Sequence, residues 1–202
     1  MILYIIRHGI TEWNKKRRMQ GRTDIPLAEE GIELAVKTGK GMASVPLDLV
    51  ISSPLNRAME TARYITEGRN IPIITDPRIQ EISFGEWEGE YVLDSEILPK
   101  GYLDCFYNDP MHIPQAPGGE TFAQVRERTG KFLEDLYNHP EYADLNILIS
   151  THGAAGRCLL SHFYDDGAYN IWRTGVPANC SVSVVEVKDR VGTVLEIDRI
   201  YN

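Results

Sequence analysis

The sequence predicts an α/β fold, a three-layer α/β/α sandwich around a mostly parallel sheet with an antiparallel edge strand. Short apolar runs alternate with helix-period segments along most of the chain, as in successive βαβ units. Two β-rich runs follow each other directly near the end, which favours a hairpin at one edge of the sheet. With 202 residues the chain has the length of one domain, so we expect a single domain over 1–202.

The first half of the chain predicts three strands and two helices. The predicted strands are the apolar runs at 1–6, 49–52 and 72–75. A helix over about 26–43 has one apolar face, made by Leu34, Ala35, Thr38 and Met42. A second helix over about 54–67 has Pro54 in its first turn, where proline is well tolerated.

The second half begins irregularly and then becomes regular. Residues 82–118 show no pattern beyond a possible short helix near 102–107. Thr121 and Gln124 have the spacing of a capping box, which predicts a helix from there to about residue 138. A strand at 146–150 and a helix over about 154–163 follow. The hairpin is predicted from runs 181–187 and 193–200, with its turn in 189–192.

The charge of the chain limits its partners. The net charge is −8 and the pI is about 5.2, which disfavours nucleic acid, because phosphate backbones are bound by basic surfaces. A small phosphorylated metabolite stays possible, since a local cluster of arginines can bind it inside an acidic protein. The composition leaves the oligomeric state open.

The cysteines and the N-terminus bear on location. Cys105, Cys158 and Cys180 match neither a zinc motif nor a C-x-x-C motif. We expect reduced thiols in a cytoplasmic protein, with Cys158 and Cys180 packed beside the core. The first residues lack the charged lead and cleavage site of a signal peptide, and no apolar run has the length of a membrane span.

Two predicted strands end in a histidine followed by glycine. Arg7-His8-Gly9 follows the strand at 1–6, and Thr151-His152-Gly153 follows the strand at 146–150. Open α/β sheets bind ligands at the carboxyl ends of their strands. Either motif alone is equally an ordinary strand with a polar end. Their repetition predicts two imidazoles that face one pocket, with Arg7 beside them as a planar cation suited to phosphate.

Two further side chains suit such a pocket. Arg57 lies in the first turns of the helix over 54–67, where the helix terminus already favours an anion. Its alternative role is an ordinary surface salt bridge. Glu81 lies between Ile79 and Ile82 and before a glycine-aromatic loop, so partial burial would let it hold a proton. Its alternative is solvated surface.

A polar loop follows the first strand. Asn14, Arg17, Gln20 and Gly21 place hydrogen-bonding groups on a segment that leaves the predicted pocket. An ordinary polar loop explains the same residues, and for Arg17 alone that is the favoured interpretation.

Taken in order, these stretches and their surroundings resemble the histidine phosphatase superfamily, the phosphoglycerate-mutase-like enzymes. The resemblance begins at residue 3 and continues beyond residue 180. The matching stretches are LYIIRHG at 3–9, TEWN at 11–14, QGRTDIPL at 20–27, SPLNRA at 53–58, ETA at 60–62, EISFGEWEG at 81–89, GGE at 118–120 and THG at 151–153.

The resemblance implies a catalytic role for five side chains. His8 is the expected nucleophile, which forms a phosphohistidine. Arg7, Arg57 and His152 are expected to hold the phosphoryl oxygens, and Glu81 is the expected proton donor to the leaving group. Since these groups supply the positive charge, the resemblance implies neither a metal nor another cofactor.

The resemblance also implies substrate contacts around this centre. Asn14 is expected to contact the phosphate, Gln20 and Gly21 to lie at the substrate mouth, and Gly153 to border the substrate. The chain departs from the usual pattern at Ile10, where Glu or Gln is common, and after Gly153, where another glycine often follows. Both departures concern the entrance and leave the catalytic groups intact.

Within the family, the sequence favours a phosphatase that hydrolyses a small phosphorylated metabolite, with a phosphoglycerate-mutase-type phosphotransferase as the alternative. Gln20-Gly21 resembles the phosphatases, whereas the glycolytic mutases usually carry Thr-Gly there. The segment between Gly89 and Gly118 is short and contains one lysine, Lys100. It contains five acidic residues, Glu90, Asp94, Glu96, Asp104 and Asp109. A negatively charged segment over the pocket is expected to repel a substrate that carries three negative charges, such as a phosphoglycerate.

The same segment contains several large apolar side chains, namely Tyr91, Tyr102, Phe106, Tyr107 and Met111. Whether they belong to the core or to the mouth of the pocket stays open. At the mouth they would favour an apolar or ring-bearing leaving group.

Two other classes of protein use the same residues differently. A metallohydrolase could bind its metal through His8, His152 and Glu81, but no H-x-x-x-H or aspartate-rich motif is present and two arginines would adjoin the cation. A non-catalytic regulatory module could keep this fold, although every expected catalytic residue is in place.

Overall fold

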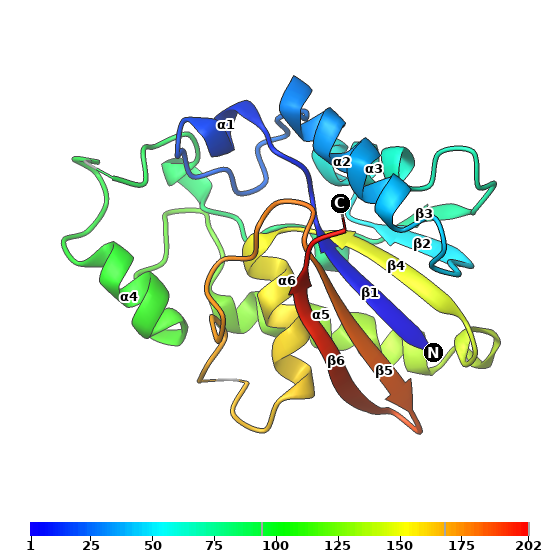
Figure 1. Ribbon diagram of the computed structural model, residues 1–202. Helices are drawn as coiled ribbons and strands as arrows, with labels where there is room; N and C mark the ends of the chain where they lie inside the picture. Colours follow the sequence, from blue (N-terminus) through cyan, green and yellow to red (C-terminus); the bar gives the residue numbers. More distant parts are fainter. Residues whose placement is uncertain (94, 168, 202) are drawn as a thin grey trace.

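A six-stranded sheet in the order β3-β2-β4-β1-β5-β6 forms the centre of the computed structural model, which describes residues 1–93, 95–167 and 169–201 (Figure 1). The strands are β1 Ile2–Arg7, β2 Leu49–Ser52, β3 Ile73–Thr75, β4 Asn146–Thr151, β5 Val182–Lys188 and β6 Val191–Arg199. The first four pair in parallel, while β5 pairs antiparallel with β1 and β6. The predicted α/β fold class is confirmed, and the antiparallel part is the predicted hairpin.

Helices cover both faces of the sheet (Figure 1). They are α1 Glu12–Lys15, α2 Glu29–Gly41, α3 Asn56–Ile65, α4 Tyr102–Asn108, α5 Phe122–Tyr137 and α6 Gly153–Leu160. The alternation of β1 decides which side chain meets which layer. Leu3 and Ile5 pack in one apolar cluster with residues of α5 and α6, whereas Ile6 packs in another with residues of α2 and α3.

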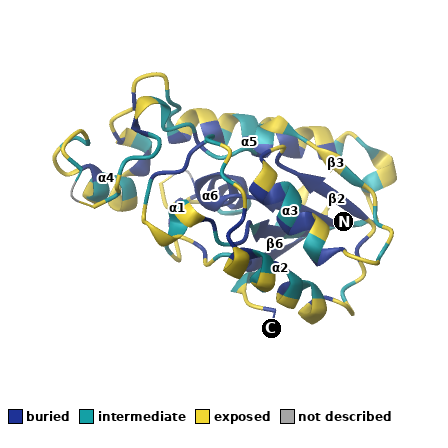
Figure 2. Cartoon of the chain, turned by 90° about the horizontal axis from the view of Figure 1, so that it is seen from above, coloured by how far each residue is buried: buried dark blue, intermediate teal, exposed yellow. Residues whose placement is uncertain are grey.

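Helix α6 differs from the other helices because every one of its residues is buried. Seen from above, α6 is dark blue throughout, whereas α2 and α5 have yellow outer faces (Figure 2). Its sequence contains only small or apolar residues apart from Arg157. A helix that is apolar on all sides belongs in the interior, so the N-terminus of α6 lies inside the protein, at the edge of the sheet where β4 ends.

Most sequence-based boundaries hold within a few residues, and the capping box of Thr121 begins α5 as the sequence predicts. Three features differ from the sequence prediction: the start of α2, the presence of α1 and the length of the turn between β5 and β6. Helix α2 starts only at Glu29, because the backbone of Leu27 pairs with Thr11 and its N–H donates to Glu60. The sequence analysis missed α1. The turn between β5 and β6 is a two-residue turn whose central residues both have positive φ, as type I′ requires.

The buried cysteines and the helix lengths bear on two further expectations. Cys158 and Cys180 are buried in apolar clusters, as the sequence predicts. Within the described residues, no helix is both long and apolar enough to cross a bilayer.

Helix α2 approaches the loop after β1 unusually closely at Gly31. The amide of Ala28 donates to the carbonyl of Ile10 at 2.9 Å. A methyl group on Gly31 would lie 2.0 Å from that same carbonyl oxygen. Glycine therefore lets the helix pack directly on the backbone that follows β1.

We expect Gly31→Ala to destabilise the protein, although alanine has the higher helix propensity by about 1 kcal/mol. The added methyl must displace backbone, and overpacking of this kind costs about 1–3 kcal/mol. The measurement is the free energy of unfolding in urea. Glu33→Ala, on the exposed face of the same helix, is the control and should change stability by less than about 0.5 kcal/mol. A stabilised Gly31→Ala protein would contradict the close approach.

Candidate active site

The two histidines predicted to share a pocket lie side by side at the carboxyl edge of the sheet. β1 and β4 pair in register up to Arg7 and Thr151, so His8 and His152 are the next residue on each strand. Their ring centroids are 5.2 Å apart. Adjacent parallel strands thus bring together two residues that are 144 positions apart, from 8 to 152, in the chain.

The imidazole of His8 is buried and held in one tautomer. Its Nδ1 lies 2.7 Å from the carbonyl oxygen of Gly9. Because a carbonyl only accepts, Nδ1 carries the hydrogen and Nε2 keeps its lone pair. Burial, followed by the nearby charges of Arg57 and Arg7, lowers the pKa of His8 well below its ordinary value of 6.5. The ring is therefore neutral at physiological pH and has a free nucleophilic nitrogen.

Two residues missed by the sequence analysis fix the turn after His8. The amide of Gly9 donates to Thr61 Oγ1 at 2.9 Å. Asn179 Nδ2 donates to the carbonyls of His8, at 2.9 Å, and Gly9, at 3.2 Å. Thr61 lies on α3 and Asn179 precedes β5, so each reaches the turn only in the folded chain.

Arg57 is fully buried, with 0% of its surface exposed. Its guanidinium donates to the carbonyls of Thr23, at 2.9 Å, and Gly21, at 2.6 Å, and to His152 Nδ1 at 3.3 Å. Burial lowers the pKa of Arg57 to about 10, so it still carries its charge at neutral pH. All three of these partners are neutral, which leaves the positive charge available to an anion.

Arg7 and Gln20 leave donors free at the same place. Arg7 Nη1 donates to the carbonyl of Pro177 at 2.5 Å. Within the described residues, Arg7 Nε and Gln20 Nε2 are buried and have no hydrogen-bond partner. Buried polar atoms without a partner are rare in folded proteins. Both residues line one cavity together with His8, so the free donors indicate a ligand that accepts hydrogen bonds.

His152 lies beside this cavity, and both of its ring nitrogens are bonded to protein. Since Nδ1 accepts from Arg57, Nε2 carries the hydrogen and donates to Ser53 Oγ at 2.8 Å. The ring thus orients the guanidinium of Arg57. The direct phosphoryl contact expected from the sequence would require one of these two hydrogen bonds to be exchanged for the ligand.

Glu81 reaches the N-terminus of α6. Its Oε1 accepts from the amides of Ile82 and Ala155, both at 2.9 Å, and its Oε2 accepts from Ala154 at 3.2 Å. The buried start of α6 therefore orients the carboxyl group. A methyl on Gly153 would lie 3.7 Å from Glu81 Oε2 and from Arg7 Nε, so Gly153 keeps open the space between acid and guanidinium.

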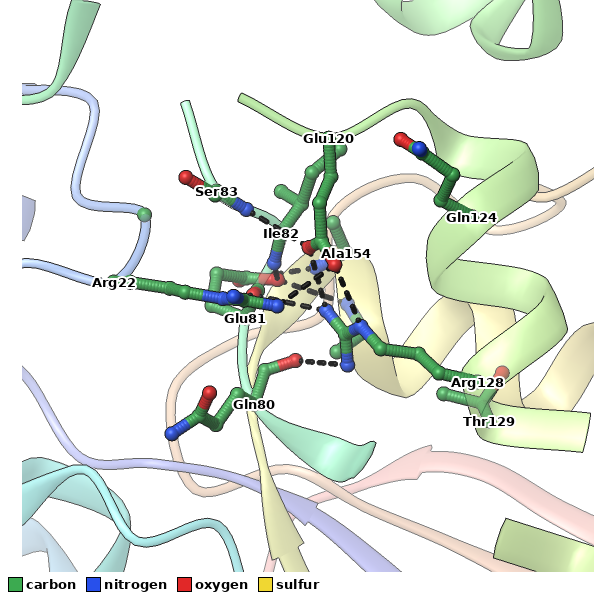
Figure 3. A network of polar contacts seen from close by, with 12 residues as sticks. Arg22, Gln80, Glu81, Ile82, Ser83, Glu120, Gln124, Arg128, Thr129 and Ala154 are labelled. Carbon is green, nitrogen blue, oxygen red and sulfur yellow. Dashed lines mark hydrogen bonds and ion pairs between the residues drawn. The ribbon is translucent and has the colours of Figure 1, made fainter. Parts of the chain in front are cut away.

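The backbone of Glu81 is fixed from the opposite side by a polar network (Figure 3). Glu120 accepts from Arg22 at 2.7 Å, from Arg128 at 3.0 and 3.1 Å, and from the amide of Ser83 at 3.1 Å. Both arginines also donate to the carbonyl of Glu81, at 3.3 and 3.0 Å. The sequence analysis gave these arginines no role.

Asn14, Gln20 and Gly21 line the cavity as the sequence predicts. Asn14 Nδ2 donates to Gln20 Oε1 at 3.3 Å, which turns the free amide nitrogen of Gln20 away from Asn14. Arg17 and Arg18, from the same loop, also border the cavity. For Arg17 the favoured interpretation was an ordinary loop residue, and the structure places it at the pocket.

The cavity has a volume of about 430 Å³ and two unlike ends. The polar end is formed by His8, Arg7, Arg57 and Glu81. The other end is apolar, and its lining residues are Met19, Phe84, Val92, Leu93, Tyr102, Leu103, Phe106, Tyr107 and Trp172.

The segment 82–118 thus lines the pocket, but with a different character from the expected acidic roof. Tyr102, Phe106 and Tyr107 border the cavity. Met111 packs beside the buried cluster that contains Tyr102, and neither it nor Tyr91 lines the cavity. Of the five acidic residues, Asp94 lies outside the described residues. The other four, Glu90, Glu96, Asp104 and Asp109, do not line the cavity.

The geometry also bears on the metal-binding alternative. Among the residues that the structure describes, no three His, Cys, Asp or Glu side chains converge as a ligand set. The ring nitrogens of His152 and the carboxylate oxygens of Glu81, which would have to ligate the metal, are already hydrogen-bonded to protein groups. The cations beside them, Arg7 and Arg57, suit an anionic ligand better than a metal ion.

We expect His8 to stay neutral when free protein is titrated from pH 8 down through pH 6.5. Replacing Arg57 by Gln removes a nearby positive charge, so the pKa of His8 should rise and protonation should begin at higher pH. Two-dimensional NMR of ¹⁵N-labelled imidazoles measures the protonation of His8 in the parent protein and in the Arg57→Gln variant. Arg63→Gln, which removes an exposed charge from the same helix, should leave the titration unchanged. A His8 that titrates at 6.5 in the parent protein would contradict the tautomer and burial described above.

Known proteins are similar to this chain over most of its length. The family described as Histidine phosphatase superfamily (branch 1) matches residues 3–199. The chain is 31% identical over 187 residues to a protein named Probable phosphoglycerate mutase GpmB from Proteus mirabilis, which covers 93% of this chain and 85% of that protein. It is 30% identical over 198 residues to Phosphoserine phosphatase 1 from Hydrogenobacter thermophilus, and the match covers 97% of this chain and 91% of that protein.

Among solved structures, one named Bacillus stearothermophilus YhfR matches with a TM-score of 0.87 at 34% identity, covering 98% of this chain and 96% of that chain. These matches confirm the resemblance first seen in the order of the sequence motifs. The chain belongs to branch 1 of the histidine phosphatase superfamily.

Proposed function

We propose that this protein is a metal-independent phosphomonoesterase that hydrolyses a small phosphorylated metabolite through a phosphohistidine at His8. The observation that supports it most directly is the hydrogen bond from His8 Nδ1 to Gly9, which leaves Nε2 as a neutral nucleophile beside two guanidinium groups. Phosphoryl transfer depends on positioning and on positive charge around the equatorial oxygens. Arg7 and Arg57 supply that charge from fixed positions.

The first step transfers the phosphoryl group to the enzyme. His8 Nε2 forms a bond to phosphorus as the bond to the ester oxygen breaks, and the departing oxygen takes a proton from Glu81. Arg7 Nε and the guanidinium of Arg57 stabilise the charge on the phosphoryl oxygens throughout. In the second step, water gives its proton to the Glu81 carboxylate and attacks phosphorus, which releases phosphate and restores His8.

The curated relative named as a probable phosphoglycerate mutase makes phosphotransfer the second candidate. The two functions differ only in the acceptor of the phosphohistidine, which is water in one and an organic hydroxyl in the other. The apolar lining of the cavity supports hydrolysis. Apart from Arg7 and Arg57, the cations that line it within the described residues are Arg17 and Arg18, and Arg18 is already engaged by Tyr91.

We expect the protein to form an acid-labile, base-stable phosphoenzyme with a labelled phosphate ester in the presence of EDTA. His8→Ala should abolish the label, because His8 is the one histidine among the described residues that line the cavity. Mass spectrometry locates the label, and His112→Ala, at an exposed histidine, is the matched control. Chasing the label into water supports the phosphatase, and chasing it only into added glycerate supports the mutase. Labelling of another histidine, or a strict need for metal, would contradict the proposal.

We expect Glu81→Gln to slow hydrolysis of an alkyl phosphate by about 10²–10⁴. Glutamine can still accept from Ala155 and Ile82 through its amide oxygen, and the change removes the proton together with the one hydrogen bond from Ala154. With p-nitrophenyl phosphate the loss should be clearly smaller, since that leaving group departs as a stable anion. Steady-state kcat/KM for both esters gives the ratio. Equal losses would mean that Glu81 positions the pocket and delivers no proton.

A further inference from the structure

The short helix α4 has one apolar face and one polar face, and they point in opposite directions. Tyr102, Leu103, Phe106 and Tyr107 line the cavity, and their spacing puts them on one face of a helix. On the other face, Asn108 donates to Asp104 at 2.7 Å, in an exposed pair. The acidic residue thus faces solvent while the rings face the pocket.

A neighbouring tryptophan supports this face. Phe106 and Trp172 have ring centroids 4.8 Å apart, and Trp172 Nε1 donates to the carbonyl of Phe106 at 2.6 Å. The one polar atom of the indole is therefore satisfied by protein, and the ring presents carbon to the cavity. Phe84 lies on the same side, 6.4 Å from Phe106. We call these six residues, Phe84, Tyr102, Leu103, Phe106, Tyr107 and Trp172, the aromatic wall.

The charged groups lie elsewhere. Arg7, Arg57 and Glu81 form the opposite end of the cavity, beside His8. At the mouth, Arg18 is engaged by Tyr91, whose hydroxyl accepts from it at 3.1 Å and whose ring lies 4.6 Å below its guanidinium. Arg17 is exposed at the rim. Apart from the hydroxyls of Tyr102 and Tyr107, the aromatic wall offers carbon, so a carboxylate placed against it would lose water without gaining a cation.

The geometry points to a substrate class: monophosphate esters whose leaving group is uncharged and apolar, either alkyl or aryl, and which lies against the aromatic wall while the phosphate occupies the His8 end. This rests on the proposed function and specifies it. The wall acts on the part of the substrate that does not react, so it sets which ester binds and leaves the chemistry at phosphorus unchanged.

The test is a series of unbranched alkyl phosphates from ethyl to hexyl, in which the leaving-group acidity is nearly constant while the chain grows. Burial of each methylene should raise kcat/KM about fourfold until the cavity is filled. A hexyl phosphate that ends in a carboxylate should be hydrolysed more slowly than hexyl phosphate itself. A preference for the carboxylated ester would overturn the inference and assign the leaving group to Arg17.

Variants locate the effect. Leu103→Ala removes part of the wall and should flatten the dependence on chain length. Phe84→Ala, in the wall but outside α4, should do so even if α4 is perturbed. Asp104→Ala, on the solvent face of α4, is the control and should keep the full dependence. A parent enzyme that hydrolyses all the esters equally would overturn this inference alone. Absence of both hydrolysis and phosphohistidine would overturn the proposed function.

Discussion

The burial of Arg57 without an acidic partner is the constraint on which the rest of the site depends. A guanidinium removed from water costs several kcal/mol unless its hydrogen bonds are replaced. Here two loop carbonyls and an imidazole replace them. A carboxylate would have done so more strongly, but it would also have cancelled the charge that an anionic ligand needs. The chain satisfies the donors of Arg57 and keeps its charge.

Several features follow from that arrangement. His152 must accept at Nδ1, so its other nitrogen must donate, and Ser53 at the end of β2 accepts from it. The same nearby charge helps to keep His8 neutral. The loop that supplies the carbonyls of Gly21 and Thr23 is in turn fixed by Glu88, which accepts from the amides of Arg22 and Thr23 at 2.9 and 2.7 Å. The charged centre and the substrate mouth are thus parts of one hydrogen-bonded structure.

The sequence predicts the fold well because the strongest signals are local. The apolar run of β1 and the capping box of Thr121 specify their elements without help from distant residues. It also predicts which side chains meet, because the carboxyl ends of parallel strands converge. It does not predict Thr61, Asn179 or the Glu120 network, whose roles arise from contacts between elements far apart in the chain. No local pattern distinguishes a threonine that fixes the His8 turn from one that merely fills space.

The segment 82–118 is a second case in which the sequence alone does not predict the lining of the pocket. Its composition is acidic, which predicts an acidic roof over the pocket. Composition does not say which way a side chain points, however. The position of each residue around the axis of α4 decides whether its side chain reaches the pocket. Asp104 is two residues from Tyr102 and from Phe106, which is about half a helical turn, so it lies on the opposite face and the ligand meets rings in place of the carboxylate.

Arg7 and Arg57 donate to carbonyls and to an imidazole and to no carboxylate of the described residues, and this has a thermodynamic consequence for the whole protein. The site is assembled from strand ends, loops and helix α3, so it exists only in the native state. Any oxyanion bound there stabilises the folded chain by mass action, by about 2.7 kcal/mol at a hundred times its dissociation constant. For a phosphatase, inorganic phosphate is such an oxyanion. Inorganic phosphate would then stabilise the folded enzyme at the same concentrations at which it competes with the substrate for this site.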